Sequence, residues 1–124
     1  MYYFLTFGAG NSYIDAVQRL ARQADEFKLF TEIFCMTESD LKEDLEFWGK
    51  HGEFMMNNRK GYGYYIWKPY IISKTLSKLE KDDILLYLDA GCELNLKYKD
   101  ELICLLDKIS STFSPYIKLI ASLD

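Results

Sequence analysis

The stretch of sequence that most constrains the fold is an uninterrupted apolar run from Ile84 to Leu88, which stops at the acidic residue Asp89. A run of this length is typical of a strand that is buried on both faces, as in parallel sheets. Ligands of open parallel sheets bind beyond the carboxyl ends of the strands. Asp89 therefore stands where a ligand site is expected. The small residues Ala90 and Gly91 would let a ligand approach the backbone.

Strand-like and helix-like patterns alternate along the chain. The predicted strands are 2–7, 28–36, 84–88 and 116–122. Helical spacing of apolar residues predicts helices over 12–25, 38–50, 69–81 and 98–110. Ser12, with Asp15 as its capping-box partner, and Thr37 are the predicted helix caps. The alternation predicts one α/β domain over residues 1–124, a three-layer αβα sandwich around a mostly parallel sheet.

The composition is that of a globular domain with many aromatic residues. Hydrophobic residues make up 49%, charged residues 27% and aromatic residues 16% of the 124 residues, which suffices for one domain with a core. The net charge of −4 provides no basic field, so nucleic acid is not expected as a partner. The apolar start is short and lacks basic residues. Neither a signal peptide nor a transmembrane segment is therefore expected, and the expected localisation is cytoplasmic.

The cysteines and the lone histidine carry little predicted chemistry. Cys35, Cys92 and Cys104 are odd in number and have no CxxC spacing. This pattern argues against a disulfide framework or a zinc site and indicates a reducing compartment. Cys35 and Cys104 lie in apolar segments and are predicted to be core thiols. His51, between two glycines at the expected end of a helix, is predicted to be a surface residue rather than a catalytic base.

A second unusual stretch runs from Gly61 to Pro69, where two glycines alternate with tyrosines and basic residues flank them. Pro69 suits the first turn of a helix. Lys68 is then expected at a helix N-terminus, where backbone N–H groups and the helix dipole favour anions. Lys68 either belongs to an anion-binding corner or is a solvated residue beside a packed loop, and the stretch alone does not separate the two. Gly8 and Gly10 favour a tight turn over a phosphate cradle.

Asp89 and Glu93 are candidate ligands of a divalent cation. A cation that bridges two phosphates takes hard oxygen ligands, which carboxylates at a strand end supply. The alternative for Asp89 is a structural role, in which its carboxylate accepts hydrogen bonds from backbone N–H groups of its own loop. A nucleophilic Asp89, as in phosphatases, would require a second acid two residues further on, where Gly91 stands.

Two motifs carry a resemblance to a known family: Gly-Tyr-Gly-Tyr-Tyr-Ile-Trp-Lys-Pro from Gly61 and Tyr-Leu-Asp-Ala-Gly-Cys-Glu-Leu from Tyr87. They resemble bacterial and viral glycosyltransferase-like proteins with the GT-A nucleotide-diphospho-sugar transferase fold, over nearly the whole chain. The resemblance implies a Rossmann-like donor-binding half that holds a nucleotide sugar, with a UDP-sugar as the expected donor, together with Mn²⁺ or Mg²⁺. The implied donor-site residues are Thr6, Phe7, Gly8, Asn11, Ser12, Tyr65, Trp67, Lys68, Asp89, Ala90 and Gly91, and the implied metal ligands are Asp89 and Glu93.

The chain departs from the family pattern in two ways. The acidic motif is usually Asp-X-Asp, and Gly91 occupies its third position. Either Glu93 replaces the missing ligand, or water and phosphates complete the site, or no metal is needed. The family also implies a later acceptor-binding half, so the chain is expected to be truncated on that side, and no catalytic base is identified. The expected function is sugar transfer to an unknown acceptor; the alternative is a non-catalytic module that acts in oligomerisation or partner binding.

Overall fold

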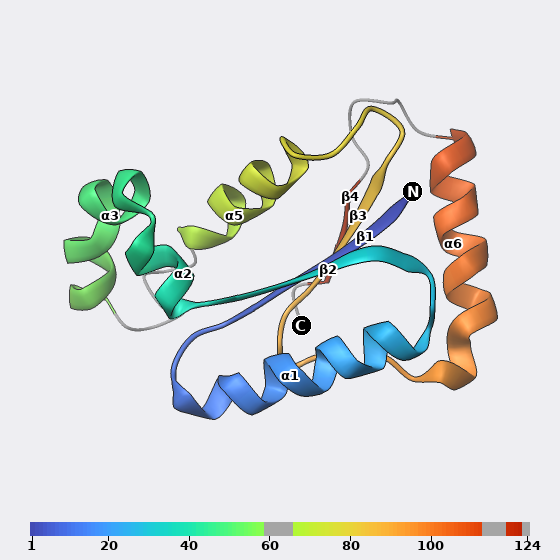
Figure 1. Ribbon diagram of the computed structural model, residues 1–124, viewed down its shortest axis with the longest axis horizontal. Coiled ribbons are helices and arrows are strands. Elements are labelled where there is room, and N and C mark those ends of the chain that lie inside the picture. Colours follow the sequence, from blue (N-terminus) through green and yellow to red (C-terminus); the bar gives the residue numbers. More distant parts are fainter. Residues whose placement is uncertain (59–65, 113–118, 123–124) are drawn as a thin grey trace.

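A computed structural model describes residues 1–58, 66–112 and 119–122 of the protein. Within these ranges, four parallel strands form one sheet in the order β2-β1-β3-β4 (Figure 1). The strands are β1 (Tyr2–Gly8), β2 (Phe30–Thr37), β3 (Ile84–Leu88) and β4 (Leu119–Ser122). The helices are α1 (Asn11–Glu26), α2 (Glu38–Glu43), α3 (Leu45–Asn57), α5 (Trp67–Leu76), the short 3-10 helix η1 (Leu96–Tyr98) and α6 (Lys99–Thr112). The predicted α/β class with a parallel sheet is confirmed for this part of the chain.

Alternate residues of the two central strands point into two separate cores. Leu5 and Tyr87 belong to the core between the sheet and the layer of α2, α3 and α5. Phe4 and Leu86 belong to the core under α1, against which Leu102 of α6 also packs. All residues from Ile84 to Tyr87 are at most 3% exposed, which confirms the prediction of a strand buried on both faces.

The turn after β1 depends on two glycines with different roles. A Cβ added to Gly8 would lie 2.6 Å from Val17 Cγ2 and 2.9 Å from Tyr13 Cβ, so only glycine lets α1 pack this closely on the strand end. Gly10 adopts a φ of 83° and is the N-cap of α1, a conformation that glycine tolerates best. The predicted cap at Ser12 is therefore wrong, because Ser12 already lies in the first turn of the helix.

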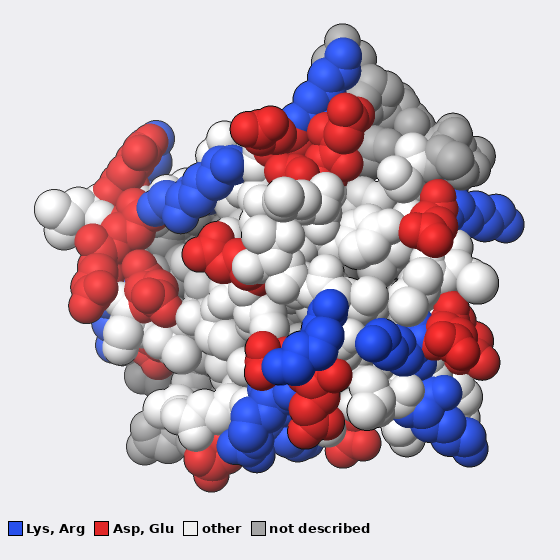
Figure 2. Space-filling model, turned by 45° about the vertical axis from the view of Figure 1, so that its right-hand side comes forward, with Lys and Arg blue, Asp and Glu red and all other residues white. Residues whose placement is uncertain are grey.

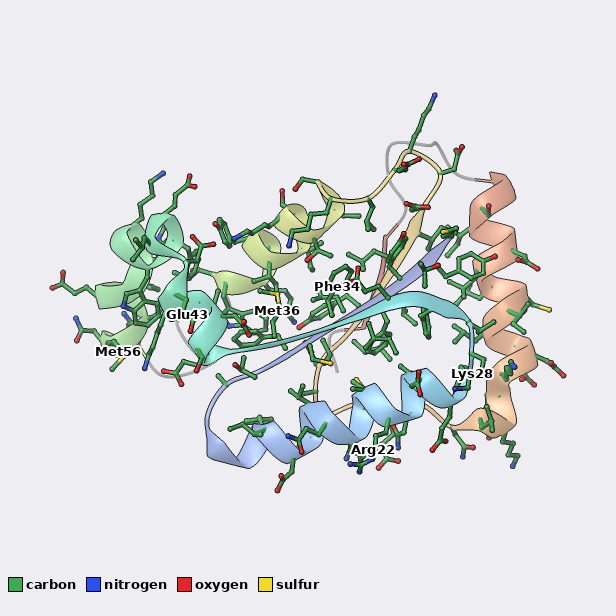
Figure 3. All side chains as sticks on the ribbon, in the orientation of Figure 1. Arg22, Lys28, Phe34, Met36, Glu43 and Met56 are labelled. Carbon is green, nitrogen blue, oxygen red and sulfur yellow. The ribbon has the colours of Figure 1, made fainter. Side chains whose placement is uncertain are left out.

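The connection from α1 to β2 shortens the predicted second strand. Lys28 has a positive φ of 55° just after the helix end at Phe27, which is the usual place for a left-handed residue. β2 consequently starts at Phe30. Its side chains Phe34 and Met36 lie on the α5 side of the sheet and pack partly buried against that core (Figure 3).

The predicted helix 38–50 is two helices. Asp44 has an extended ψ of 95° and its side chain accepts a hydrogen bond from the Phe47 backbone N–H, so it ends α2 and caps α3. The predicted cap at Thr37 is confirmed, with its N–H donating to the Asp40 carboxylate. The glycines of this region, Gly49 and Gly52, lie inside α3 instead of ending a helix.

Several side chains differ from their expected environment. Cys35 and Cys104 are exposed, so the prediction of core thiols is wrong for both. The reason for Cys35 is that β2 is the outermost strand of the sheet on its side. Leu45 shares the helical apolar spacing of Leu41 and Trp48 but is 84% exposed. His51 is exposed and lies 5.1 Å from the Phe47 ring, which agrees with a surface role.

The later elements follow the predicted order with shifted ends. α5 ends at Leu76 rather than near residue 81, with Pro69 in its first turn as predicted. α6 extends to Thr112, and β4 covers the last part of the predicted strand 116–122, of which 116–118 lie outside the described residues. Lys and Arg side chains are interspersed with Asp and Glu on the face shown in Figure 2. None of the described helices combines the length and apolar character that a membrane crossing requires.

Candidate functional site

The two motifs singled out in the sequence meet in an ion pair. Lys68, in the first turn of α5, places its Nζ 3.0 Å from Oδ1 of Asp89, the residue that follows β3. The two side chains are only 13% and 23% exposed, so the pair is largely withdrawn from water. The first turn of α5 contains no acidic residue. Asp89 therefore supplies the negative charge that pairs with Lys68.

Tyr87 completes the surroundings of this carboxylate. Its hydroxyl donates a hydrogen bond of 2.7 Å to Asp89 Oδ1. Burial, with the bonded Asp89 carboxylate as the second cause, raises the pKa of Tyr87 far above its ordinary value, so the hydroxyl remains a donor at all physiological pH values. The Lys68 amino group also lies 5.4 Å from the centre of the Tyr87 ring and 5.6 Å from that of Trp67. Aromatic faces at such distances attract a cation.

Phe7 and Trp67, the residue before Lys68, stack with ring centres 4.1 Å apart. Both are at most 5% exposed and belong to the α5-side core. They connect the end of β1 with the start of α5 and thereby fix the position of Lys68. Thr6 is fully buried, and its Oγ1 has no hydrogen-bond partner among the described residues.

The site lies where ligands of open parallel sheets bind. β1 and β3 pair in parallel up to Leu5 and Tyr87, and β1 continues to Gly8. Asp89 therefore lies beside the carboxyl end of β1. The chain leaves β1 for β2 on one side, whereas β3 lies on the other side. This arrangement makes the gap between the carboxyl ends of β1 and β3 a topological switch point.

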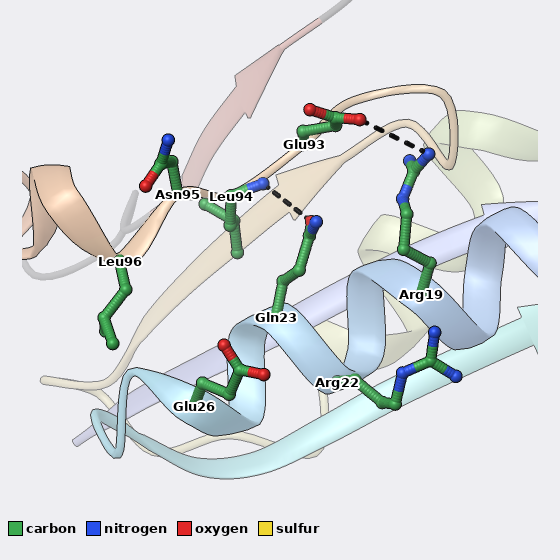
Figure 4. A pocket seen from close by; sticks show the side chains of 8 residues that line it. All are labelled: Arg19, Arg22, Gln23, Glu26, Glu93, Leu94, Asn95 and Leu96. Carbon is green, nitrogen blue, oxygen red and sulfur yellow. Dashed lines mark hydrogen bonds and ion pairs between the residues drawn. The ribbon is translucent and has the colours of Figure 1, made fainter.

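The loop after Asp89 is held from the opposite layer by α1. Arg19 donates hydrogen bonds to the carbonyl oxygens of Ala90 at 3.1 Å and Cys92 at 2.7 Å. One turn further along α1, Gln23 Oε1 accepts a hydrogen bond of 2.9 Å from the Leu94 N–H (Figure 4). Sequence reasoning missed both residues, because a side chain that bonds distant backbone carbonyls leaves no motif.

Glu93 is directed to a different layer from Asp89. Its carboxylate lies 3.7 Å from Arg19 Nη1 on α1 and is 71% exposed, whereas Asp89 bonds α5. Within the described ranges, no group of three or more His, Cys, Asp or Glu side chains could hold a metal ion. Of the predicted pair, Asp89 is therefore the residue that the structure places at the switch point.

A shallow pocket of about 430 Å³ lies between α1 and the segment that follows Asp89. Two contacts cross between α1 and this segment at the pocket, as Figure 4 shows: Arg19 pairs with Glu93, and Gln23 accepts a hydrogen bond from the Leu94 N–H. The full lining is Arg19, Arg22, Gln23, Glu26, Glu93, Leu94, Asn95 and Leu96. The pocket is separated from Lys68 by the loop itself, since Lys68 approaches Asp89 from the α5 layer.

The remaining predicted donor-site residues divide into two groups. Ala90 is buried with its carbonyl bonded to Arg19, and Gly91 is exposed with open space where a Cβ would lie. Tyr65 lies outside the described residues, as do the side chains of Asn11 and Ser12. The structure therefore brings together Phe7, Trp67, Lys68 and Asp89.

A second polar cluster, formed by Asp44, Tyr70 and Lys74, holds α5 against the start of α3. Asp44 Oδ2 accepts a hydrogen bond of 2.6 Å from the Tyr70 hydroxyl and lies 2.7 Å from Lys74 Nζ. Bonds from Lys74, Tyr70 and the Phe47 N–H lower the pKa of Asp44 to about 2. This cluster ties the start of α3 to α5 and thereby supports the helix that carries Lys68.

Fold and site together define a parallel α/β domain with a charged, partly buried pair at its switch point. Comparisons of the chain with protein-family models, with curated proteins and with solved structures give no match.

Proposed function

We propose that the protein binds a nucleotide-diphosphate sugar together with a divalent cation, as the donor-binding part of a glycosyltransferase. The observation that carries the proposal is the 3.0 Å approach of Lys68 and Asp89 at the switch point. Lys68 and the N-terminus of α5 offer the positive charge that a diphosphate requires. Asp89 offers the hard oxygen that a cation requires.

In the proposal, the Asp89 carboxylate supplies the protein ligand of Mn²⁺ or Mg²⁺. Tyr87 and Lys68 both contact Oδ1, and Oδ2 takes no hydrogen bond or ion pair in the described ranges. A carboxylate oxygen at a partly exposed strand end is the ligand type that these cations prefer. In the proposal, diphosphate oxygens and water complete the coordination. A bound cation would neutralise the charge that develops on the leaving diphosphate.

Lys68 contributes to the same chemistry without moving a proton. Its ammonium group is held between the Tyr87 and Trp67 rings, so its positive charge is already oriented before any ligand arrives. Preorganised charge of this kind stabilises a departing diphosphate at little reorganisation cost. The sugar transfer itself, its acceptor and a UDP-sugar as the donor belong to the same proposal.

Thermal denaturation with UDP, GDP, ADP and CDP, each with and without Mn²⁺, tests the proposal. One nucleoside diphosphate with Mn²⁺ is expected to raise the Tm by roughly 10 °C at a hundredfold excess over its Kd. Asp89→Asn is expected to abolish the shift, and Asp15→Asn on the exposed face of α1 is the matched control. No shift with any of the four nucleotides at millimolar concentration would contradict the proposal.

The exposed edge of β2 favours a second candidate function, association with another chain. In the described part of the sheet, β2 pairs with β1 alone, and its side chains Thr31, Glu32 and Cys35 are exposed. Unpaired backbone groups along such an edge readily pair with a further strand. Sedimentation distinguishes the two functions, because a stable dimer whose Tm ignores all nucleotides would favour association.

A further inference from the structure

We infer that the pocket between α1 and the segment after Asp89 binds a small zwitterion, an α-amino acid with an apolar side chain. The pocket lies against α1, whereas Lys68 reaches Asp89 from the α5 layer, so it is separate from the proposed donor site. Its volume of about 430 Å³ falls within the range of about 300–1,000 Å³ that is typical of small-molecule sites. The inference concerns a second ligand and does not depend on the proposed function.

Two opposite charges of α1 line the pocket. The side chains of Arg22 and Glu26 are exposed, and neither forms an ion pair or a hydrogen bond within the described ranges. Opposite charges four residues apart on a helix can pair, but Figure 4 shows the charged ends of these two side chains apart along the pocket. A guanidinium group binds a carboxylate, and a carboxylate binds an ammonium group. Arg22 and Glu26 therefore suit the two charged groups of an amino acid.

Two further hydrogen-bond donors belong to side chains that line the pocket. Gln23 Oε1 accepts a hydrogen bond from the Leu94 N–H, so the amide nitrogen of Gln23 keeps donor hydrogens that no residue of the described ranges accepts. Arg19 Nε is buried and also has no acceptor among the described residues. Unsatisfied donors of this kind are unfavourable. A ligand carboxylate offers the acceptor oxygens that these donors lack.

The balance of charges disfavours a polyanion in this pocket. Arg19 lies 3.7 Å from the Glu93 carboxylate, so the lining carries two positive charges and the two negative charges of Glu26 and Glu93. A nucleoside diphosphate would be attracted by the arginines but repelled by both carboxylates. A zwitterion has no net charge and meets an opposite charge at each of its two charged groups. The pocket thus selects a different class of ligand from the donor site.

Leu94 and Leu96 form the apolar part of the lining. Leu94 packs against the core under α1, whereas the Leu96 side chain is 48% exposed. A ligand side chain that covers Leu96 would remove apolar surface from water, which favours binding. The ligand is therefore an amino acid with an apolar side chain rather than one with a further charge.

Titration with leucine, methionine and phenylalanine, followed by backbone amide chemical shifts, tests the inference. At least one of the three is expected to shift the amides of Gln23 and of residues 93–96, and the shifts should saturate at millimolar concentration. The analogue without the amino group and the analogue without the carboxylate are then compared with the amino acid that binds most tightly. Each analogue should bind at least about tenfold more weakly, because one charged group of the pocket loses its partner.

Substitutions in α1 test the two charges of the protein. Arg22→Gln and Glu26→Gln should each weaken binding of the amino acid about tenfold or more. Both side chains are exposed, so neither change removes a core contact. Glu46→Gln and Lys50→Gln are the matched controls, because these residues carry opposite charges at the same spacing on the exposed surface of α3 and do not line this pocket. The controls should leave the affinity unchanged.

Binding that requires both charged groups of the amino acid and both charges of α1 supports the inference. The inference is overturned if none of the three amino acids shifts these amides, if either analogue binds as tightly as the amino acid, or if the control variants lose as much affinity as Arg22→Gln. The thermal shift with a nucleoside diphosphate tests the donor site separately. That shift should be the same in Arg22→Gln, Glu26→Gln and the wild type, so either proposal can fail while the other stands.

Discussion

The Lys68 amino group lies 3.0 Å from the Asp89 carboxylate and joins the first turn of α5 to the carboxyl end of β3. The two residues come from the two motifs that stand out in the sequence, the stretch from Gly61 to Pro69 and the strand end at Asp89. Tyr87 bonds the same carboxylate oxygen. A lysine from the first turn of α5 and a buried hydroxyl of β3 thus meet on one oxygen atom at the strand end. The predictions below concern this contact and the packing that supports it.

Tyr87→Phe should destabilise the protein without changing its fold. The substitution removes the hydroxyl that bonds Asp89 Oδ1 at 2.7 Å while keeping the buried ring. The expected loss in the free energy of unfolding is about 1 kcal/mol, measured by urea denaturation at pH 7. Tyr13→Phe, at an exposed position of α1, is the control. Equal stability of Tyr87→Phe and the wild type would show that this hydrogen bond contributes nothing.

Asp44→Asn should change the acid sensitivity of the fold. The Asp44 pKa falls from 3.8 to about 2 in the folded protein, chiefly because Lys74 and Tyr70 bond its carboxylate. A lowered folded pKa gives a stabilisation that is present above pH 4 and is lost as the pH falls from about 4 towards 2. Wild-type Tm should therefore exceed that of Asp44→Asn at pH 7, and the difference should shrink by pH 2.5. A difference independent of pH would argue against this role of Asp44.

Alanine at two glycines should have opposite effects. Gly8→Ala places a Cβ within 2.6 Å of Val17 on α1, and this overpacking should cost about 1–3 kcal/mol. Gly49 lies exposed inside α3 with open space around a Cβ. Gly49→Ala should therefore stabilise by about 0.5–1 kcal/mol. The midpoints of urea denaturation measure both effects. A Gly8→Ala variant as stable as the wild type would contradict the close packing of α1 on β1.

Arg19→Lys should loosen the loop after Asp89 locally. Lysine cannot reproduce the two hydrogen bonds from the guanidinium group to the Ala90 and Cys92 carbonyls. Amide exchange at Cys92 and Leu94 should accelerate about tenfold, while amides of β1 keep their protection. Arg22→Lys, on the same helix, is the matched control. Unchanged exchange at Leu94 would mean that Gln23 alone holds the loop.

The elements that sequence reasoning placed correctly are those with a strong local signal. The strand 84–88 is apolar throughout and bounded by charges, so its extent and its position between two layers followed from composition. Lys68 at a helix start followed from Pro69, whose missing N–H has no helical partner there. Asp89 at a strand end followed from the extent of the strand 84–88.

The features that sequence reasoning misplaced depend on distant contacts. The apolar spacing of residues 41–48 continues through Asp44, and only its extended backbone and its bonds to Tyr70 and Lys74 reveal the break. Cys35 was predicted to be a core residue because no local sequence pattern reveals the strand order, which places β2 at the edge of the sheet. Arg19 acts on backbone carbonyls, which every residue possesses, so nothing in the sequence marks its partner.

Isothermal titration of the wild type with the nucleoside diphosphate that gives the largest thermal shift, in the presence and absence of Mn²⁺, tests the central claim most directly. The site at Lys68 and Asp89 predicts binding in the presence of Mn²⁺, at least tenfold weaker binding without it, and loss of the Mn²⁺ effect in Asp89→Asn. Binding that is equally tight with and without Mn²⁺, and unaffected by Asp89→Asn and Lys68→Met, would contradict the claim that these two residues form the donor site.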